Sequence, residues 1–177
     1  MKTLIDGYNL IFECGLHGKQ INADSLAKAR TELLDKIRAV FPEEEWRQIA
    51  VVFDAKKEML SGQKERDDYL GVPVYYSIRF SDADEMIEEF IAKHSNPKNL
   101  LVVSSDHRIQ KAALRRKSRI SDSGDWFDKL DSFSRQYESN LEVDKPEISL
   151  TADEMHQFMD DLKEEMDDDP KGWTKFS

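Results

Sequence analysis

Residues 4–10 read Leu-Ile-Asp-Gly-Tyr-Asn-Leu, and this stretch decides the fold class. The apolar residues before Asp6 predict a strand that ends at its carboxylate, and Gly7 allows the backbone to turn immediately afterwards. Asn9 follows three residues after the aspartate. In open α/β sheets, ligands bind at the edge where the strands end. The stretch therefore predicts a strand that carries Asp6 to a ligand-binding edge.

Two further apolar runs end in the same way. Residues 49–53 are followed by Asp54, and residues 100–105 are followed by Asp106. Nearly continuous apolar runs are typical of parallel strands that are covered on both faces. Parallel strands all end at one edge of their sheet. We therefore expect Asp6, Asp54 and Asp106 to lie close together when their strands are neighbours.

Helical periodicity fills the intervals between these strands. The helices are predicted at about residues 23–40, 82–93, 107–114 and from 124 onward. Further strands are predicted at 72–77 and around Ile120. The alternation predicts an α/β fold, a doubly wound parallel sheet of about five strands flanked by helices. Residues 12–21 and 42–45 are expected to be irregular, and the charged segment 55–70 is either a substrate-facing loop or solvated surface.

The 177-residue chain has a formal net charge of −10 that is divided unevenly. Residues 1–120 hold 20 basic and 19 acidic side chains, whereas residues 121–177 hold 6 and 17. The body of the chain is thus nearly neutral and can bind a polyanion through a local basic patch. The single cysteine, Cys14, fits a reducing cytoplasm and is interpreted as a small buried hydrophobe in preference to a nucleophile. No apolar run is long enough to span a membrane.

The acidic end of the chain is expected to form an extension. Residues 151–154, Thr-Ala-Asp-Glu, match a capping box, and apolar side chains then recur at helical spacing up to Met166. We therefore predict a domain over residues 1–140 and an extension over 141–177 with one acidic amphipathic C-terminal helix. Its Met-rich face either docks on the domain itself or binds a protein partner.

Clustered carboxylates at one sheet edge favour a metal site. A fourth acidic group, residues 82–85, opens the helix after the strand at 72–77 and belongs to the same edge. Because like charges repel, three or four carboxylates need a cation or bound protons. Oxygen ligands select Mg²⁺ or Mn²⁺, and such ions promote phosphodiester cleavage. In the alternative interpretation these acids have only structural roles, since aspartates often cap helices and the first helical turn favours acidic side chains.

Other kinds of site receive less support from the sequence. The four histidines lack the spacing of zinc ligands, and the chain has no Gly-rich phosphate loop. A phosphoryl-transfer receiver domain, which is also a doubly wound sheet, would need a pair of adjacent acids after its first strand. Asp6 stands alone at that position.

Four segments, taken in order, carry a more specific signal. They are Ile5-Asp6-Gly7-Tyr8-Asn9, Val51-Val52-Phe53-Asp54-Ala55, Ala83-Asp84-Glu85-Met86-Ile87-Glu88 and Val103-Ser104-Ser105-Asp106. With this set the chain resembles NYN domains of the PIN-like nuclease superfamily, and within them the YacP-like group, over roughly residues 1–135. The resemblance implies a PIN-like sheet with strand order about 3-2-1-4-5. It also implies ribonuclease activity that depends on Mg²⁺ or Mn²⁺.

The resemblance further implies roles for individual residues. The acidic catalytic and metal-binding residues would be Asp6, Asp54, Asp84 and Asp106. Asn9 would orient Asp6 or a phosphate. Glu88 lies one helical turn after Asp84 and would support the site or bind the metal. Three further carboxylates could approach the same edge, namely Asp82, Asp122 and Asp125.

Contacts with RNA are expected from basic and aromatic side chains. The densest basic stretch follows Asp106 and comprises Arg108, Lys111, Arg115, Arg116, Lys117 and Arg119. Its natural target is the phosphate backbone, although a solvated helix face would have the same composition. Tyr8 either stacks on a base beside the metal or packs in the core. A further hypothesis is that the acidic extension covers a basic groove and competes with RNA.

Taken together, these features predict a cytoplasmic, Mg²⁺- or Mn²⁺-dependent endoribonuclease that cleaves RNA phosphodiester bonds at a cluster of carboxylates. RNA, free or on the ribosome, is the expected partner, and no membrane association is expected. The alternative is a catalytically inactive RNA- or ribosome-binding module on the same scaffold.

Overall fold

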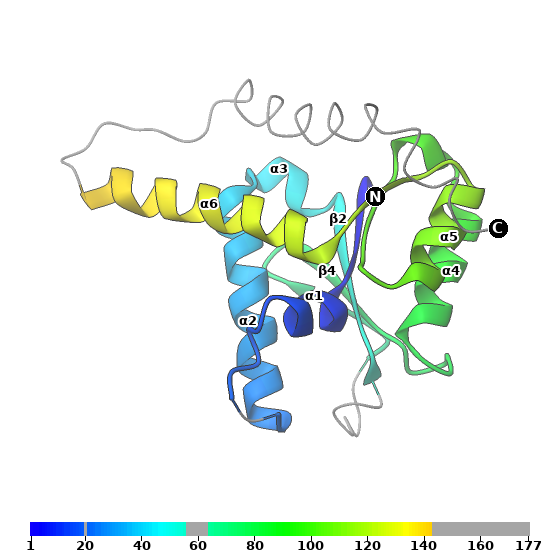
Figure 1. Cartoon of the computed structure of the whole chain (residues 1–177), viewed down its shortest axis with the longest axis horizontal. Coiled ribbons are helices and arrows are strands. Elements are labelled where there is room, and N and C mark those ends of the chain that lie inside the picture. The colour runs from blue at the N-terminus through cyan, green and yellow to red at the C-terminus, as the bar shows by residue number, and fades with distance from the viewer. Residues whose placement is uncertain (20, 56–63, 143–177) are drawn as a thin grey trace, which may run out of the picture.

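A computed structural model describes residues 1–19, 21–55 and 64–142, which form an α/β fold of three layers (Figure 1). In these residues, six strands form one sheet in the order β3-β4-β2-β1-β5-β6. The strands are β1 (Thr3–Asp6), β2 (Ile49–Phe53), β3 (Arg66–Tyr69), β4 (Val72–Tyr76), β5 (Leu101–Val103) and β6 (Arg119–Ser121). The helices are α1 (Gly7–Glu13), α2 (Ala23–Val40), α3 (Glu43–Trp46), α4 (Ala83–Lys93), η2 (Pro97–Asn99), α5 (His107–Arg115) and α6 (Ser123–Glu142).

Strand β1 lies inside the sheet and pairs in parallel with β2 on one side and β5 on the other. Its Ile5 is in register with Val51 and with Val103, so the three strands end together. Strands β4 and β6 extend the parallel sheet outward on each side. Counted without β3, the parallel strands have the order 3-2-1-4-5, which confirms the predicted topology.

The sixth strand, β3, was not predicted. Residues 55–70 were expected to be irregular, yet Arg66–Tyr69 pairs antiparallel with β4 at the edge of the sheet. Its sequence, Arg-Asp-Asp-Tyr, lacks the apolar alternation of a half-buried strand, and three of its four residues are exposed. Charged side chains on an edge strand disfavour pairing with other chains.

Alternation along the strands divides the core between the two faces. In β1, Ile5 faces the side covered by α1, α2 and α6, whereas Leu4 faces α4 and α5. In β2, Val51 faces the same side as Ile5, and Val52 faces the same side as Leu4. Figure 1 shows these two helical layers on opposite sides of the sheet. Both faces are covered, and this explains why the parallel strands read as continuous apolar runs.

Local capping explains where α2 and α4 begin. The Asn22 side chain accepts from the Ser25 N–H, and the Ser25 hydroxyl accepts from the Asn22 N–H, so the two residues form a capping box for α2. The N-cap of α4 is Asp82, which accepts from the Glu85 N–H at 2.8 Å. The preceding residue, Ser81, has a serine side chain that could also cap a helix, but it donates to the Glu85 carboxylate instead.

Two segments predicted to be irregular contain helices. The chain after Asp6 continues directly into α1, and residues 43–46 form the short helix α3. Gly7 is therefore the first residue of a helix and not a turn. Its essential property is the absence of a side chain, since a Cβ atom there would lie 2.2 Å from Cε1 of Phe53. The sheet and α1 can approach this closely only at a glycine.

The C-terminal part of the chain is described only in part. Helix α6 continues through residue 140, where the domain boundary was predicted, and ends at Glu142. The amphipathic helix predicted after residue 151 and the proposed cover over a basic groove lie outside the described residues. In the described ranges, no helix is both long and apolar enough to cross a membrane.

Candidate active site

The predicted acidic residues follow the strand ends along one edge of the sheet. Asp6 ends β1, Asp54 directly follows β2, and Asp106 is the N-cap of α5 shortly after β5. Asp84 lies in the first turn of α4, which the chain enters after β4. The parallel register explains this arrangement, because β1, β2 and β5 run in the same direction and end together.

Asp6 is the most enclosed of these acids, with 5% of its surface exposed. One carboxylate oxygen, Oδ1, accepts from the Asn9 N–H at 3.2 Å and so caps α1. The other, Oδ2, accepts from the hydroxyl of buried Ser104 at 3.1 Å. These contacts fix the carboxylate in one orientation and partly offset the cost of burying its charge.

Ser104 connects Asp6 to Asp106. While its hydroxyl donates to Asp6, its oxygen accepts from the Asp106 N–H at 3.1 Å. The Asp106 Oδ1 atom in turn accepts from the backbone N–H groups of Arg108 and Ile109, at 2.6 and 3.4 Å. The carboxylate of Asp106 is thus held at the N-terminus of α5, where the helix dipole favours a negative charge.

Asp54 is positioned by a second serine. The Ser77 hydroxyl, which is buried just beyond β4, donates to Asp54 Oδ1 at 3.3 Å. The same oxygen of Ser77 accepts from the Ala55 N–H at 3.2 Å. The loop after β2 is therefore tied to the loop after β4. Sequence reasoning missed both Ser77 and Ser104, although each directly follows an apolar strand.

Asp84 shows that negative charge accumulates at this edge. Its pKa is raised above the usual range, first by burial, then by the charges of Asp106 and Asp82. Glu88 raises the pKa of Asp84 further, whereas Arg108 lowers it. Neighbouring carboxylates that raise one another's pKa favour a bound cation. Asp84 and Asp106 therefore share one electrostatic environment.

Arg108 supplies a positive charge to this environment. Its Nε and Nη2 atoms donate to the two carboxylate oxygens of Glu88, at 3.1 and 2.7 Å. Its Nη1 atom lies 3.8 Å from Oδ2 of Asp84. Glu88, predicted to support the site, thus binds an arginine, and the guanidinium of Arg108 is directed toward the acids.

The donor chemistry of this edge fits a hard divalent cation. Asp6, Asp54, Asp84 and Asp106 offer only oxygen, the donor type that Mg²⁺ and Mn²⁺ prefer. Within the described residues, however, no three His, Cys, Asp or Glu side chains lie close enough to hold a metal ion together. Mg²⁺ usually keeps several waters and needs only one or two carboxylates. The residues therefore fit a hydrated ion and do not form a preassembled cage.

Asn9, which was predicted to orient Asp6 or a phosphate, contacts Asp6 through its backbone. Its backbone N–H, and not its side chain, donates to Asp6. Its side-chain oxygen accepts from the Ser105 N–H at 2.9 Å and from the Ser123 hydroxyl at 2.7 Å. Asn9 thus joins α1 to the loop before Asp106 and to the start of α6.

Replacing Asn9 with alanine is expected to lower the free energy of unfolding by about 2 kcal/mol, because two partly buried donors lose their acceptor. Chemical denaturation measures this change. The Ser123→Ala variant removes one of the two contacts and is expected to lose about 1 kcal/mol. An Asn9→Ala loss no larger than that of Ser123→Ala would contradict the double contact.

Tyr8 cannot stack on a base, which corrects one of the two roles considered for it. Only 2% of its surface is exposed, and its ring packs against Phe53 with centroids 5.1 Å apart. Its hydroxyl accepts from Nη1 of Arg30 at 3.0 Å. The Arg30 guanidinium also lies over the Phe53 and Tyr76 rings, at 5.8 and 6.0 Å from their centroids. Tyr8 is therefore a core residue.

The basic stretch that follows Asp106 runs away from the acidic edge of the sheet. Helix α5 starts at the acidic edge and runs back along the sheet, so that its nine residues span about 13 Å. After it, Arg119 pairs with Leu101, the first residue of β5, and Nη2 of Arg116 donates to the His94 carbonyl beyond α4. The residues that the helix carries to the opposite edge are Arg115, Arg116, Lys117 and Arg119. Lys111 lies between the two edges.

The remaining predicted carboxylates have structural contacts. Asp82 caps α4, and Asp122 accepts from the Gly124 N–H at 2.9 Å at the start of α6. Asp125 lies exposed in the first turn of α6.

Burial, followed by the charges of Asp128, Glu13 and Asp122, raises the pKa of the Cys14 thiol to about 12. A thiol that stays protonated is a poor nucleophile, which agrees with the prediction for Cys14.

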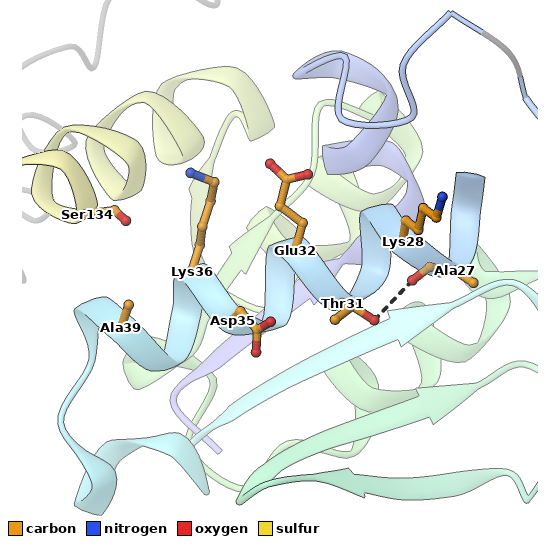
Figure 2. A pocket seen from close by; sticks show the side chains of 8 residues that line it. All are labelled: Ala27, Lys28, Thr31, Glu32, Asp35, Lys36, Ala39 and Ser134. Atoms are coloured by element: carbon orange, nitrogen blue, oxygen red, sulfur yellow. Dashed lines mark hydrogen bonds between the residues drawn. The ribbon is translucent and has the colours of Figure 1, made fainter. Parts of the chain in front are cut away.

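A groove of about 670 Å³ lies between α2 and α6, and Figure 2 shows the side chains that line it. They are Ala27, Lys28, Thr31, Glu32, Asp35, Lys36, Ala39 and Ser134. Acidic and basic side chains occur in equal number, and none belongs to the predicted acidic site. Lys36 is also paired with Asp131 at 2.8 Å. The groove is therefore a separate, mixed-charge surface.

Comparisons with known proteins agree with this fold. Two crystal structures of Rae1 (YacP) from Bacillus subtilis, one of them a point variant, have a similar fold. The variant is 24% identical to this chain, with a TM-score of 0.59 over 92% of this chain and 98% of that chain. The other is 20% identical, with a TM-score of 0.58 over 94% and 91%. No curated protein gives a significant sequence match.

The family comparison covers nearly the whole chain. The model of the YacP-like NYN domain matches residues 3–171, so the match extends beyond residue 135, where the resemblance was expected to end. The matched residues include Asp6, Asp54, Asp84 and Asp106, and they continue into a part of the chain that the structure does not describe. The chain therefore belongs to the YacP-like NYN domain family, a family of nuclease-type domains.

Proposed function

We propose that this protein is a metal-dependent endoribonuclease that hydrolyses RNA phosphodiester bonds at the acidic edge of its sheet. The observation that carries the proposal is that four carboxylates lie along one edge of the sheet, each placed by the end of a parallel strand or by the helix that follows it. Membership of a nuclease-type family supports the same reaction class.

Asp6, Asp54, Asp84 and Asp106 would hold Mg²⁺ or Mn²⁺. When bound, such an ion activates water and offsets phosphate charge. The chain's own contribution is to fix the acids before substrate arrives, through the hydroxyls of Ser104 and Ser77. Preorganised groups of this kind stabilise a charged transition state without having to reorient during the reaction.

Removing divalent metal is expected to reduce RNA cleavage at least about a hundredfold, and adding Mn²⁺ is expected to restore it. The assay follows a labelled single-stranded RNA with enzyme treated with EDTA and then dialysed. Cleavage that persists in excess EDTA would refute the metal-dependent mechanism.

The alternative, an RNA-binding module without activity, makes a different prediction in the same samples. It predicts RNA binding without cleavage and no heat of Mn²⁺ binding in calorimetry. The presence of Asp6, Asp54, Asp84 and Asp106 favours the catalytic function, because a protein that only binds a phosphate backbone does not require several negative charges at one edge.

A further inference from the structure

Arg108 occupies an unusual position for a residue at an acidic edge. Its backbone N–H donates to Asp106, so its first helical turn is fixed by one of the proposed metal ligands. Its side chain then crosses from α5 to α4, where it forms a two-pronged ion pair with Glu88 and approaches Asp84. Arg108 is thus in contact with three carboxylates from two helices.

The surroundings of Arg108 favour a cation. Asp84 and Glu88 contact its guanidinium, and Asp106 accepts from its backbone N–H. The side chains of Arg108, Asp84 and Glu88 keep 49%, 33% and 32% of their surface exposed. The guanidinium is therefore at the mouth of the acidic edge and can leave it without disturbing the core.

We propose that Arg108 is the resident counter-ion of the acidic edge, which competes with the divalent cation for Asp84 and is displaced when the cation binds. This inference rests on the proposed function. It is carried by the contacts of the guanidinium, which pairs with Glu88 and lies beside Asp84.

Competition of this kind sets the affinity for metal. A guanidinium a few ångströms from Asp84 repels an arriving divalent cation and occupies carboxylate oxygens that could otherwise bind it or its waters. The arginine must release Glu88 and Asp84 before the cation can use them. The apparent affinity for the ion is lowered by this competition, in the same way that any competing ligand lowers it.

The test compares Mn²⁺ binding to four full-length proteins by isothermal titration calorimetry, without RNA. In Arg108→Gln the competing charge is removed, and Mn²⁺ is expected to bind roughly five- to tenfold more tightly than to the wild type. Arg108→Lys keeps the charge and is expected to remain close to wild type. Arg135→Gln is the matched control, because Arg135 pairs with Asp131 on α6, and its affinity is expected to be unchanged. Circular dichroism confirms that each variant is folded.

Three outcomes of this experiment distinguish support for the role of Arg108, failure of that role, and failure of the metal-dependent function. Tighter binding in Arg108→Gln alone supports the competition. Equal or weaker binding in folded Arg108→Gln, with measurable binding in the wild type, overturns the role of Arg108 and leaves the proposed nuclease function standing. No Mn²⁺ binding to any of the proteins overturns the metal-dependent function and this inference with it.

Discussion

Replacing Asp6 with asparagine is expected to reduce RNA cleavage at least about a hundredfold while the chain stays folded. Asp6 is the enclosed acid at the inner strand of the sheet, and hydrogen bonds from Asn9 and Ser104 hold its carboxylate in place. Asparagine has the same shape but no charge, so it cannot attract a cation as aspartate does. The variant therefore tests the charge of Asp6 while the structure around it is kept.

The fold is expected to tolerate this change because each contact of Asp6 has a neutral equivalent. Asparagine is as good an N-cap as aspartate, so its oxygen can still accept from the Asn9 N–H. The Ser104 hydroxyl can accept as well as donate, and can therefore pair with an amide. The free energy of unfolding is expected to change by less than about 1 kcal/mol.

The measurement is cleavage of labelled RNA with Mn²⁺, together with thermal unfolding of the same samples. Asp24→Asn is the control, because Asp24 is an exposed acid in the first turn of α2. It is expected to keep full activity. Substantial Mn²⁺-dependent activity in Asp6→Asn would show that Asp6 is not a catalytic metal ligand.

Replacing Gly7 with alanine is expected to destabilise the protein by about 3 kcal/mol, the upper range for overpacking a core. The added Cβ would lie 2.2, 2.6 and 2.8 Å from three atoms of the Phe53 ring. That ring is fully buried and packs against Tyr8 and Tyr76, so it has no space into which it can move. For a domain of this size the melting temperature would fall by roughly 6–12 °C.

Thermal and chemical denaturation measure the change. Gly124→Ala is the matched control, since its Cβ would meet only the Asp122 side chain, at 3.4 Å, and its stability is expected to be nearly unchanged. In the double variant with Phe53→Leu, the smaller side chain is expected to recover part of the loss caused by Gly7→Ala. A Gly7→Ala protein as stable as Gly124→Ala would contradict the close approach of α1 to the sheet.

The sequence was most informative where a single local rule decides the structure. Continuous apolar runs ending in Asp6, Asp54 and Asp106 predicted parallel strands, because both faces of this sheet are covered. The family resemblance added the strand order. Helix α2 was predicted with its observed ends, since its apolar spacing and its Asn22 cap agree.

The sequence was less informative where contacts between distant segments determine the structure. Two roles were left open for Tyr8, and its packing against Phe53 of β2 decides between them. The ion pair that Arg108 forms with Glu88 on another helix was not predicted. β3 carries no apolar pattern, because only its pairing with β4 defines it. No local window of sequence contains these partners.

The register of β1 between β2 and β5 has a consequence for the synthesis of the protein. Ile5 pairs with residues 51 and 103, so the acidic edge is assembled from segments that are far apart along the chain. Such non-local pairing is slow compared with local helix formation. A nascent chain that has not yet released β5 lacks Asp106 and the Ser104 contact to Asp6. The proposed nuclease site therefore cannot form during the first half of translation, and any cleavage through this site has to wait until the sheet is nearly complete.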